Sequence, residues 1–169
     1  YVLDGGLPAW IAAGGAVEDG PPLAPTPRHF SPRVRADLVA TFDQVRRIVE
    51  EGGPAQIVDV RPAARFSGAA PEPRPGVRAG HMPGALNIPF PDLLEPDGKM
   101  KSREALAALF DEKGVALKRP IIATCGSGVT AAILALALAR LGKTDAKVYD
   151  GSWTEWGSNA ETPIATGSA

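Results

Sequence analysis

The stretch PIIATCGSGVTAAILALAL, residues 120–138, changes its character twice along its length. It opens with apolar, partly β-branched residues, which are typical of a buried strand. Glycines then flank a cysteine, and the stretch closes in a run of alanine and leucine that predicts a buried helix. A strand, a glycine-containing turn and a helix in this order indicate an α/β fold, with Cys125 at the turn.

The same alternation of strands and helices continues through the rest of the chain. Strands are expected within residues 34–40, 56–60, 85–89, 120–124 and 146–150. Helices are expected from Thr41, with Gln44 in a capping box and Gly52 just past the end, from Ser102 to Phe110, and over 129–141. Because the strands are apolar on both faces and alternate with helices, they predict a parallel sheet.

The composition is that of an ordinary globular protein. Apolar residues make up 44% and charged residues 22% of the 169 residues, which argues against disorder. The net charge of −1 gives no basis for a nucleic-acid or membrane-surface partner. The longest apolar run, residues 131–139, is too short to span a bilayer.

The chain contains a single cysteine and two histidines. One cysteine cannot form an internal disulfide or a zinc site of the CxxC type, and His29 and His81 lie far apart in the sequence. We therefore expect no metal and no other cofactor. A lone cysteine favours a reducing compartment, so we expect a cytoplasmic protein.

The first residues repeat a segment near the other end of the chain. The matched positions have identical spacing in both copies: Val2, Asp4, Gly5 and Trp10 correspond to Val148, Asp150, Gly151 and Trp156. Short matches also arise by chance in a chain rich in glycine and alanine. The shared spacing favours the alternative, that residues 1–15 are the tail of a preceding copy of the domain. Residues 16–32 are rich in proline and predict a connector, and the complete domain is expected over 33–169.

Cys125 is expected at the carboxyl end of a parallel strand, where open α/β sheets form their active sites. Gly126 and Gly128 allow a tight turn whose N–H groups point inward, and the following helix directs its positive end to the same place. These groups should lower the pKa of the thiol and make it nucleophilic. The alternative is a small buried hydrophobic residue, as most free cysteines are. The strand–turn–helix context favours the nucleophile.

Five short motifs strengthen this interpretation by their order. They are DVRPAARF (59–66), PEPRPG (71–76), GHMPGALNIPF (80–90), CGSGVT (125–130) and YDGSW (149–153). Together the motifs resemble those of rhodanese-type sulfurtransferases, in particular the 3-mercaptopyruvate sulfurtransferases, over residues 33–157. The resemblance implies a three-layer sandwich with a central, mainly parallel five-stranded sheet flanked by helices. It also implies a tandem protein whose second domain is catalytic, in agreement with the repeated tail.

The resemblance implies a two-step enzymatic reaction. The Cys125 thiolate would take the sulfur of 3-mercaptopyruvate, release pyruvate and become a persulfide, and a thiol, thioredoxin or cyanide would accept the outer sulfur. Thr130 and the N–H groups from Gly126 through Gly128 to Val129 would cradle the anionic persulfide, much as an oxyanion hole holds oxygen. Ser127 would bind substrate or relay a proton, and its alternative role is that of a turn residue.

Two arginines are candidates for binding the donor. Arg65 and Arg74 occupy the positions that the family uses for a carboxylate, which a guanidinium binds through two hydrogen bonds. The alternative for each is a solvated loop charge. Relatives that prefer thiosulfate carry basic residues after the cysteine, whereas Gly126 and Ser127 are neutral. The loop therefore favours 3-mercaptopyruvate, with a thiosulfate:cyanide sulfurtransferase as the alternative.

Two other polar residues are expected to be structural. His81 could act as a general base, but its motif looks architectural in relatives. Asp59, at a strand end, is expected to anchor the loop that carries Arg61.

Single features of the chain argue for or against two other functions. Dual-specificity phosphatases share this fold but need a C-x5-R loop, and the arginine position is Ala131 here. A non-catalytic rhodanese-like binding or regulatory module is opposed by the cysteine, although the lack of a first domain speaks for it. That domain, in cis or as a separate chain, is the expected partner. We expect the isolated chain to be weakly active.

Overall fold

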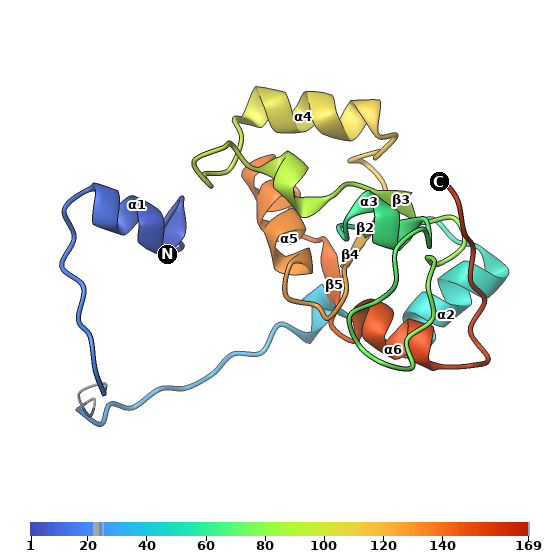
Figure 1. The fold of residues 1–169 in the computed structure, drawn as a ribbon, viewed down its shortest axis with the longest axis horizontal. Helices are drawn as coiled ribbons and strands as arrows, with labels where there is room; N and C mark the ends of the chain where they lie inside the picture. Colours follow the sequence, from blue (N-terminus) through green and yellow to red (C-terminus); the bar gives the residue numbers. More distant parts are fainter. Residues whose placement is uncertain (22–23, 25, 169) are drawn as a thin grey trace.

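A five-stranded parallel sheet runs through the centre of the fold (Figure 1). The computed structural model describes residues 1–21, 24 and 26–168. In these residues the strands follow the order β1-β5-β4-β2-β3, and every pairing is parallel. Their bounds are Val39–Ala40 (β1), Gln56–Asp59 (β2), Leu86–Asn87 (β3), Ile121–Thr124 (β4) and Lys147–Tyr149 (β5). The predicted α/β class and five strands are confirmed, and the sheet is parallel throughout.

Helices cover both faces of this sheet (Figure 1). Buried residues of α4 and α5, such as Phe110 and Leu134, pack against one face, and those of α2 and α6, such as Val45 and Trp156, against the other. The bounds are Phe42–Glu51 (α2), Ala63–Phe66 (α3), Arg103–Glu112 (α4), Ala131–Arg140 (α5) and Ser152–Ser158 (α6), with short 3-10 turns at Ala36–Leu38 (η1) and Phe90–Leu93 (η2). The three-layer arrangement is thereby confirmed. Among the described helices, each is too short or too polar to cross a bilayer.

Capping residues set the helix boundaries. The Thr41 hydroxyl accepts the Gln44 N–H at 3.3 Å, and the Gln44 amide oxygen accepts the Thr41 N–H at 3.2 Å, so the predicted capping box is confirmed. Ser102 caps α4 in the same way, by accepting the Ala105 N–H. Helix α5 begins at Ala131, two residues later than predicted, because the preceding residues belong to the turn that carries Cys125.

Two short helices, α3 and α6, are not predicted from the sequence. Helix α6 contains Gly157 and three serine or threonine residues in seven, which individually favour turns. It forms because Trp153 and Trp156 are completely buried against the sheet, and burial of an apolar face outweighs weak helix propensity. The indole N–H groups donate to the carbonyls of Arg78 and Pro163, which satisfies their polar atoms.

The N-terminal segment contains a further helix, Gly6–Ala12 (α1). Its bounds precede those of α6 by the same number of residues that separates the repeated positions, as the repeat requires. Asp4 joins this segment to the sheet domain by accepting the Met100 N–H at 2.8 Å and pairing with Arg140 at 3.4 Å. The described part of residues 16–32 contains no helix or strand, and residues 22, 23 and 25 of the predicted connector lie outside the described residues. The division into 1–15, 16–32 and 33–169 remains a prediction.

Replacement of Trp156 by alanine should destabilise the domain by about 3–5 kcal/mol, because a large buried side chain leaves a cavity. Urea denaturation measures the change in the free energy of unfolding. Trp10 is the matched control, since it occupies the equivalent position of the repeat but is 46% exposed, and Trp10→Ala should cost less than about 1 kcal/mol. Equal losses for the two variants would contradict this assignment of the core.

Candidate active site

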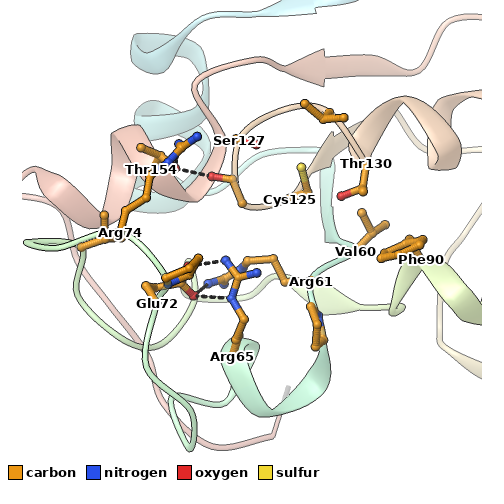
Figure 2. Close-up of a pocket in the computed structure, with 15 residues that line it drawn as sticks. Val60, Arg61, Arg65, Glu72, Arg74, Phe90, Cys125, Ser127, Thr130 and Thr154 are labelled. Carbon is orange, nitrogen blue, oxygen red and sulfur yellow. Dashed lines mark hydrogen bonds and ion pairs between the residues drawn. The ribbon is translucent and has the colours of Figure 1, made fainter. Parts of the chain in front are cut away.

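A pocket of about 260 Å³ opens beside Cys125, at the edge of the sheet where the parallel strands end (Figure 2). Asp59 of β2 pairs with Thr124 of β4, so Val60 and Cys125 leave the sheet side by side. The pocket draws its lining from the ends of these strands, the loops after β2 and β4, η2 and α6. Its members include Val60, Arg61, Arg65, Glu72, Arg74, Val77, Phe90, Cys125, Gly126, Ser127, Val129, Thr130 and Thr154.

The loop that carries Cys125 is fastened to the start of α6. The Cys125 N–H donates to the Ser152 hydroxyl at 3.1 Å, and this hydroxyl donates to the Tyr149 carbonyl at 2.7 Å. The Cys125 carbonyl in turn accepts the Trp153 N–H at 2.9 Å. Ser152 has a φ of 50°, the one positive value among the described residues that are not glycine, and such strain persists where the surroundings hold it in place. Helix α6 thus positions the cysteine backbone.

Opposing effects act on the Cys125 thiol, which is 1% exposed. Burial raises the pKa of the thiol, while the Thr130 hydroxyl and the N–H groups of Ser127, Ala131 and Thr130 donate hydrogen bonds that lower it, and the net pKa lies below the ordinary value. The thiol therefore ionises more easily than an ordinary cysteine in spite of its burial. Ser127 and Thr130 were expected in this cradle, whereas the Ala131 N–H, from the first residue of α5, was not.

The other residues of the predicted cradle have different surroundings. Gly126 and Val129 line the pocket, and Val129 is 75% exposed. A Cβ atom on Gly126 would lie 3.0 Å from the nearest guanidinium nitrogen of Arg65. Gly128 has a φ of 82°, and a Cβ atom there would lie 2.6 Å from the Asp150 carbonyl oxygen. Gly128 therefore allows the left-handed turn and the close approach of β5 to the loop.

Both predicted arginines line the pocket (Figure 2). Arg65 donates to Glu72 through Nε at 3.1 Å and also through Nη2. The hydrogen bonds to Glu72 raise the pKa of Arg65, burial opposes them, and the charge of Cys125 adds to the increase. Arg74 donates from Nη1 to the Thr154 hydroxyl at 2.7 Å.

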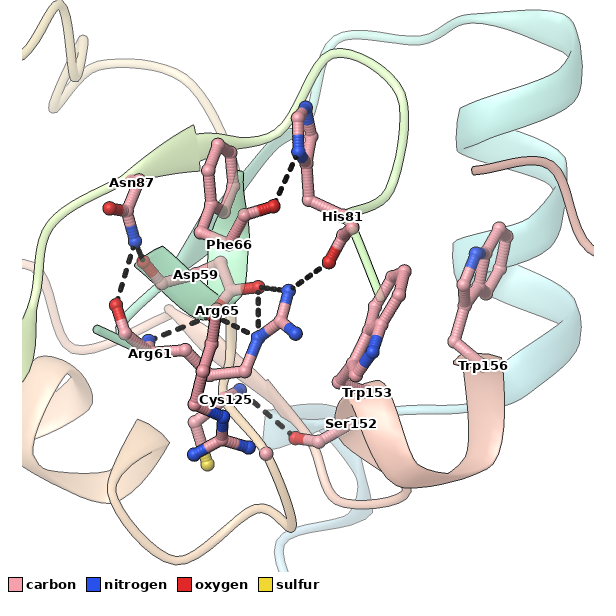
Figure 3. A network of polar contacts seen from close by, with 12 residues as sticks. Asp59, Arg61, Arg65, Phe66, His81, Asn87, Cys125, Ser152, Trp153 and Trp156 are labelled. Carbon is pink, nitrogen blue, oxygen red and sulfur yellow. Dashed lines mark hydrogen bonds and ion pairs between the residues drawn. The ribbon is translucent and has the colours of Figure 1, made fainter. Parts of the chain in front are cut away.

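A buried network of charges lies behind the pocket (Figure 3). The Asp59 carboxylate accepts hydrogen bonds from the Arg61 backbone and guanidinium at 2.7–3.2 Å, as expected for an anchor of this loop. Arg61 is itself 1% exposed, and its guanidinium lies over the Trp153 ring at 4.3 Å from the centroid.

His81 packs inside the domain rather than at the pocket. It is buried, its Nδ1 contacts the Phe66 carbonyl at 2.8 Å, and its ring stacks on that of Phe66 at 3.8 Å. The structure thus places His81 away from the residues that line the pocket, in agreement with the structural interpretation.

Several residues of the site were not singled out from the sequence. Glu72 belongs to the PEPRPG motif, but an acidic residue between prolines looks like part of a solvated loop. Thr154 could be found only with α6, which the sequence does not predict. Within the described ranges, no group of three His, Cys, Asp or Glu side chains is arranged to hold a metal ion.

Comparison with known proteins identifies relatives of this arrangement. A family model described as Rhodanese-like domain matches residues 41–159. The chain is 43% identical to the Escherichia coli 3-mercaptopyruvate sulfurtransferase, with 96% of this chain and 57% of the relative covered. It is 42% identical to the Arabidopsis thaliana thiosulfate/3-mercaptopyruvate sulfurtransferase 1, mitochondrial, with 97% and 48% covered.

A solved structure gives the same result. The Tum1 protein from Saccharomyces cerevisiae superposes with a TM-score of 0.70 at 29% identity, over 78% of this chain and 47% of that protein. The chain therefore spans about half the length of the relatives that it matches. Because the family model covers well over half of the chain, including Cys125 and the whole loop after it, the chain belongs to the rhodanese-like domain family.

Proposed function

We propose that the chain is the sulfur-carrying domain of a sulfurtransferase that uses 3-mercaptopyruvate as its donor. The observation that carries this proposal is the cradle of hydrogen-bond donors around Cys125, which lowers the pKa of a thiol that burial alone would raise. A sulfur anion held in this way is both a nucleophile and, after reaction, a stabilised carrier. The names of the E. coli and plant relatives support the same reaction class.

In the first step the Cys125 thiolate attacks the sulfur of 3-mercaptopyruvate. A sulfur–sulfur bond forms and the carbon–sulfur bond breaks, and its electron pair leaves with the carbon as the enolate of pyruvate, which then takes up a proton. The Cys125 persulfide remains on the protein. In the second step an acceptor thiolate, such as that of a small thiol or a thioredoxin, attacks the outer sulfur and releases the Cys125 thiolate. Cyanide can accept the same sulfur.

The pocket residues have separate roles in this proposal. The Thr130 hydroxyl and the loop N–H groups hold the negative sulfur, while Gly126 and Val129 leave room above it. Arg65 and Arg74 bind the donor carboxylate, for which Arg74 offers a guanidinium with most of its donors uncommitted. Ser127, at the pocket wall, binds the donor or passes a proton to the leaving carbon.

Thiosulfate is the second candidate donor. Attack on its outer sulfur would give the same persulfide and release sulfite, and the name of the plant relative includes this substrate. The neutral Gly126 and Ser127 favour the carboxylate donor, because a dianion gains more from cations close to the cysteine.

The proposal includes a second rhodanese-like domain as partner, in cis or as a separate chain. The chain spans about half of its relatives, and two exposed apolar residues of α1, Leu7 and Trp10, occupy the positions that the buried Trp153 and Trp156 hold in the repeat. An exposed apolar face of this kind needs a sheet to cover it. A cytoplasmic location also remains part of the proposal, on the strength of the single cysteine.

Incubation with 3-mercaptopyruvate should add one sulfur atom to the protein, because the activated Cys125 thiolate retains it. Intact mass spectrometry measures the gain, and Cys125→Ser should abolish it. The absence of any gain with 3-mercaptopyruvate or thiosulfate, even with a first-domain fragment supplied, would exclude the enzyme in favour of a binding module.

Thr130→Val should raise the pKa of the Cys125 thiol, because one hydrogen bond to the thiolate is lost. The midpoint of iodoacetamide alkylation against pH should move upward, since a higher pKa leaves less thiolate at a given pH. Thr144→Val, at an exposed position, is the control and should leave the midpoint unchanged. An unchanged midpoint in Thr130→Val would contradict the role of Thr130 in stabilising the Cys125 thiolate.

Arg74→Ala should reduce the rate of persulfide formation from 3-mercaptopyruvate at low donor concentration by about tenfold or more, because a charge-assisted contact with the carboxylate is lost. The loss with thiosulfate should be smaller. Arg47→Ala, on the exposed side of α2, should leave both rates unchanged. Equal losses with the two donors would contradict the carboxylate role.

A further inference from the structure

We propose that Glu72 is a positioning residue that fixes the guanidinium of Arg65 and thereby sets the preference of the pocket for a carboxylate donor over thiosulfate. This inference rests on the proposed function. It concerns a residue that does not react itself but acts through Arg65 (Figure 2).

Glu72 is a buried carboxylate shared by two arginines. Its side chain is 4% exposed. One oxygen accepts Arg61 Nη1 at 2.8 Å and Arg65 Nε at 3.1 Å, and the other accepts Arg65 Nη2. Glu72 therefore holds Arg65 through two adjacent nitrogens, which is the contact that fixes the plane of a guanidinium.

Glu72 is held in turn by Arg61, whose own side chain is fixed by other partners. The Nε and Nη2 atoms of Arg61 are committed to Asp59, and Nη2 also donates to the Gly80 carbonyl at 2.8 Å. Since the Arg61 side chain is 1% exposed, rotation would leave a buried charge unpaired. The series Asp59, Arg61, Glu72, Arg65 thus runs from the sheet to the pocket with each member fixed by the one before it.

This arrangement determines which edge of Arg65 meets the donor. Because Glu72 occupies Nε and one side of Nη2, the remaining donors lie on the Nη edge, which approaches Gly126 in the loop of Cys125. In the view of Figure 3 this end of Arg65 projects over the Cys125 side chain. A guanidinium edge presented in one fixed orientation suits the two oxygens of a carboxylate.

Glu72 also balances charge beside the reactive sulfur. The two carboxylates and two guanidiniums of the series sum to zero, so Arg74 supplies the remaining positive charge among the residues that line the pocket. A dianion gains more from each added unit of positive charge than a donor with one negative charge does. Loss of the Glu72 charge should therefore favour thiosulfate, and the loss of a fixed Arg65 should weaken carboxylate binding, so both effects move the donor preference in the same direction.

The test is Glu72→Gln, which keeps the shape of the side chain and removes its charge. The rates of Cys125 persulfide formation from 3-mercaptopyruvate and from thiosulfate are measured by intact mass at low donor concentrations, and their ratio is compared with that of the unmodified chain. We expect the ratio to fall about tenfold. Glu50→Gln is the matched control, because Glu50 pairs with Arg46 on the surface of α2, and its ratio should not change.

A double variant separates positioning from a general structural effect. In the Arg65→Ala background, Glu72→Gln should change the ratio clearly less than in the unmodified chain, because the positioning of Arg65 is absent and only the charge effect of Glu72 remains. Should Glu72→Gln fail to fold, Glu72→Asp takes its place, since it keeps the charge but shortens the reach to Arg65. Its ratio should still fall below that of the unmodified chain, because Arg65 is no longer held in its orientation.

The outcomes distinguish this inference from the proposed function. An unmodified chain that takes sulfur from neither donor would overturn both. An active unmodified chain with an unchanged ratio in the folded Glu72 variant, or with equal losses for the two donors, would overturn the role of Glu72 alone. An effect of Glu72→Gln in the Arg65→Ala background as large as that in the unmodified chain would also overturn it.

Discussion

The buried charge of Arg61 constrains the fold at the edge of the sheet where the pocket lies. A guanidinium that is 1% exposed must find partners on every side, because an unpaired buried charge is strongly destabilising. Asp59, Glu72 and the Gly80 carbonyl provide them, and the ring of Trp153 covers the guanidinium plane. These partners come from the end of β2, from two points of the following loop and from α6. One side chain therefore ties together the segments that surround Cys125.

Backbone N–H groups of the loop that carries Cys125 counteract the effect of burial on the ionisation of its thiol. A thiol at this depth would ordinarily resist ionisation, yet hydrogen bonds from the loop and from the first turn of α5 shift its pKa below the ordinary value. The backbone can supply these donors only in a tight turn, which Gly128 permits through its positive φ and its contact with Asp150. In our proposal the same turn also holds a persulfide, whose charge lies one atom farther out. A phosphate would need an additional clamp, and α5 begins there with a buried alanine, Ala131.

The charge of Arg65 links the buried charges around Arg61 to the loop of Cys125. Arg65 lies at the boundary between the buried series and the pocket, and its charge acts on both Glu72 and Cys125. A donor that binds as we propose meets a site whose cations are already partly neutralised, while Arg74 keeps most of its hydrogen-bond donors free. In our proposal the Cys125 sulfur carries out the reaction. Arg65 and Arg74, together with Glu72, which holds Arg65, discriminate between the donors.

The sequence by itself determined the features that depend on neighbouring residues. The apolar runs predicted the strands, Thr41 and Gln44 predicted a capping box, and the glycines around Cys125 predicted a strand–turn–helix site. These signals are local, since a cap, a turn and a buried strand are each specified within a few positions. Only the tertiary structure decided that α6 forms, that the Ala131 N–H reaches the sulfur and that Glu72 joins two arginines. Helix α6 exists because the sheet buries its tryptophans, and the role of Glu72 comes from Arg61 and Arg65, eleven and seven residues away, which the fold brings to the same carboxylate.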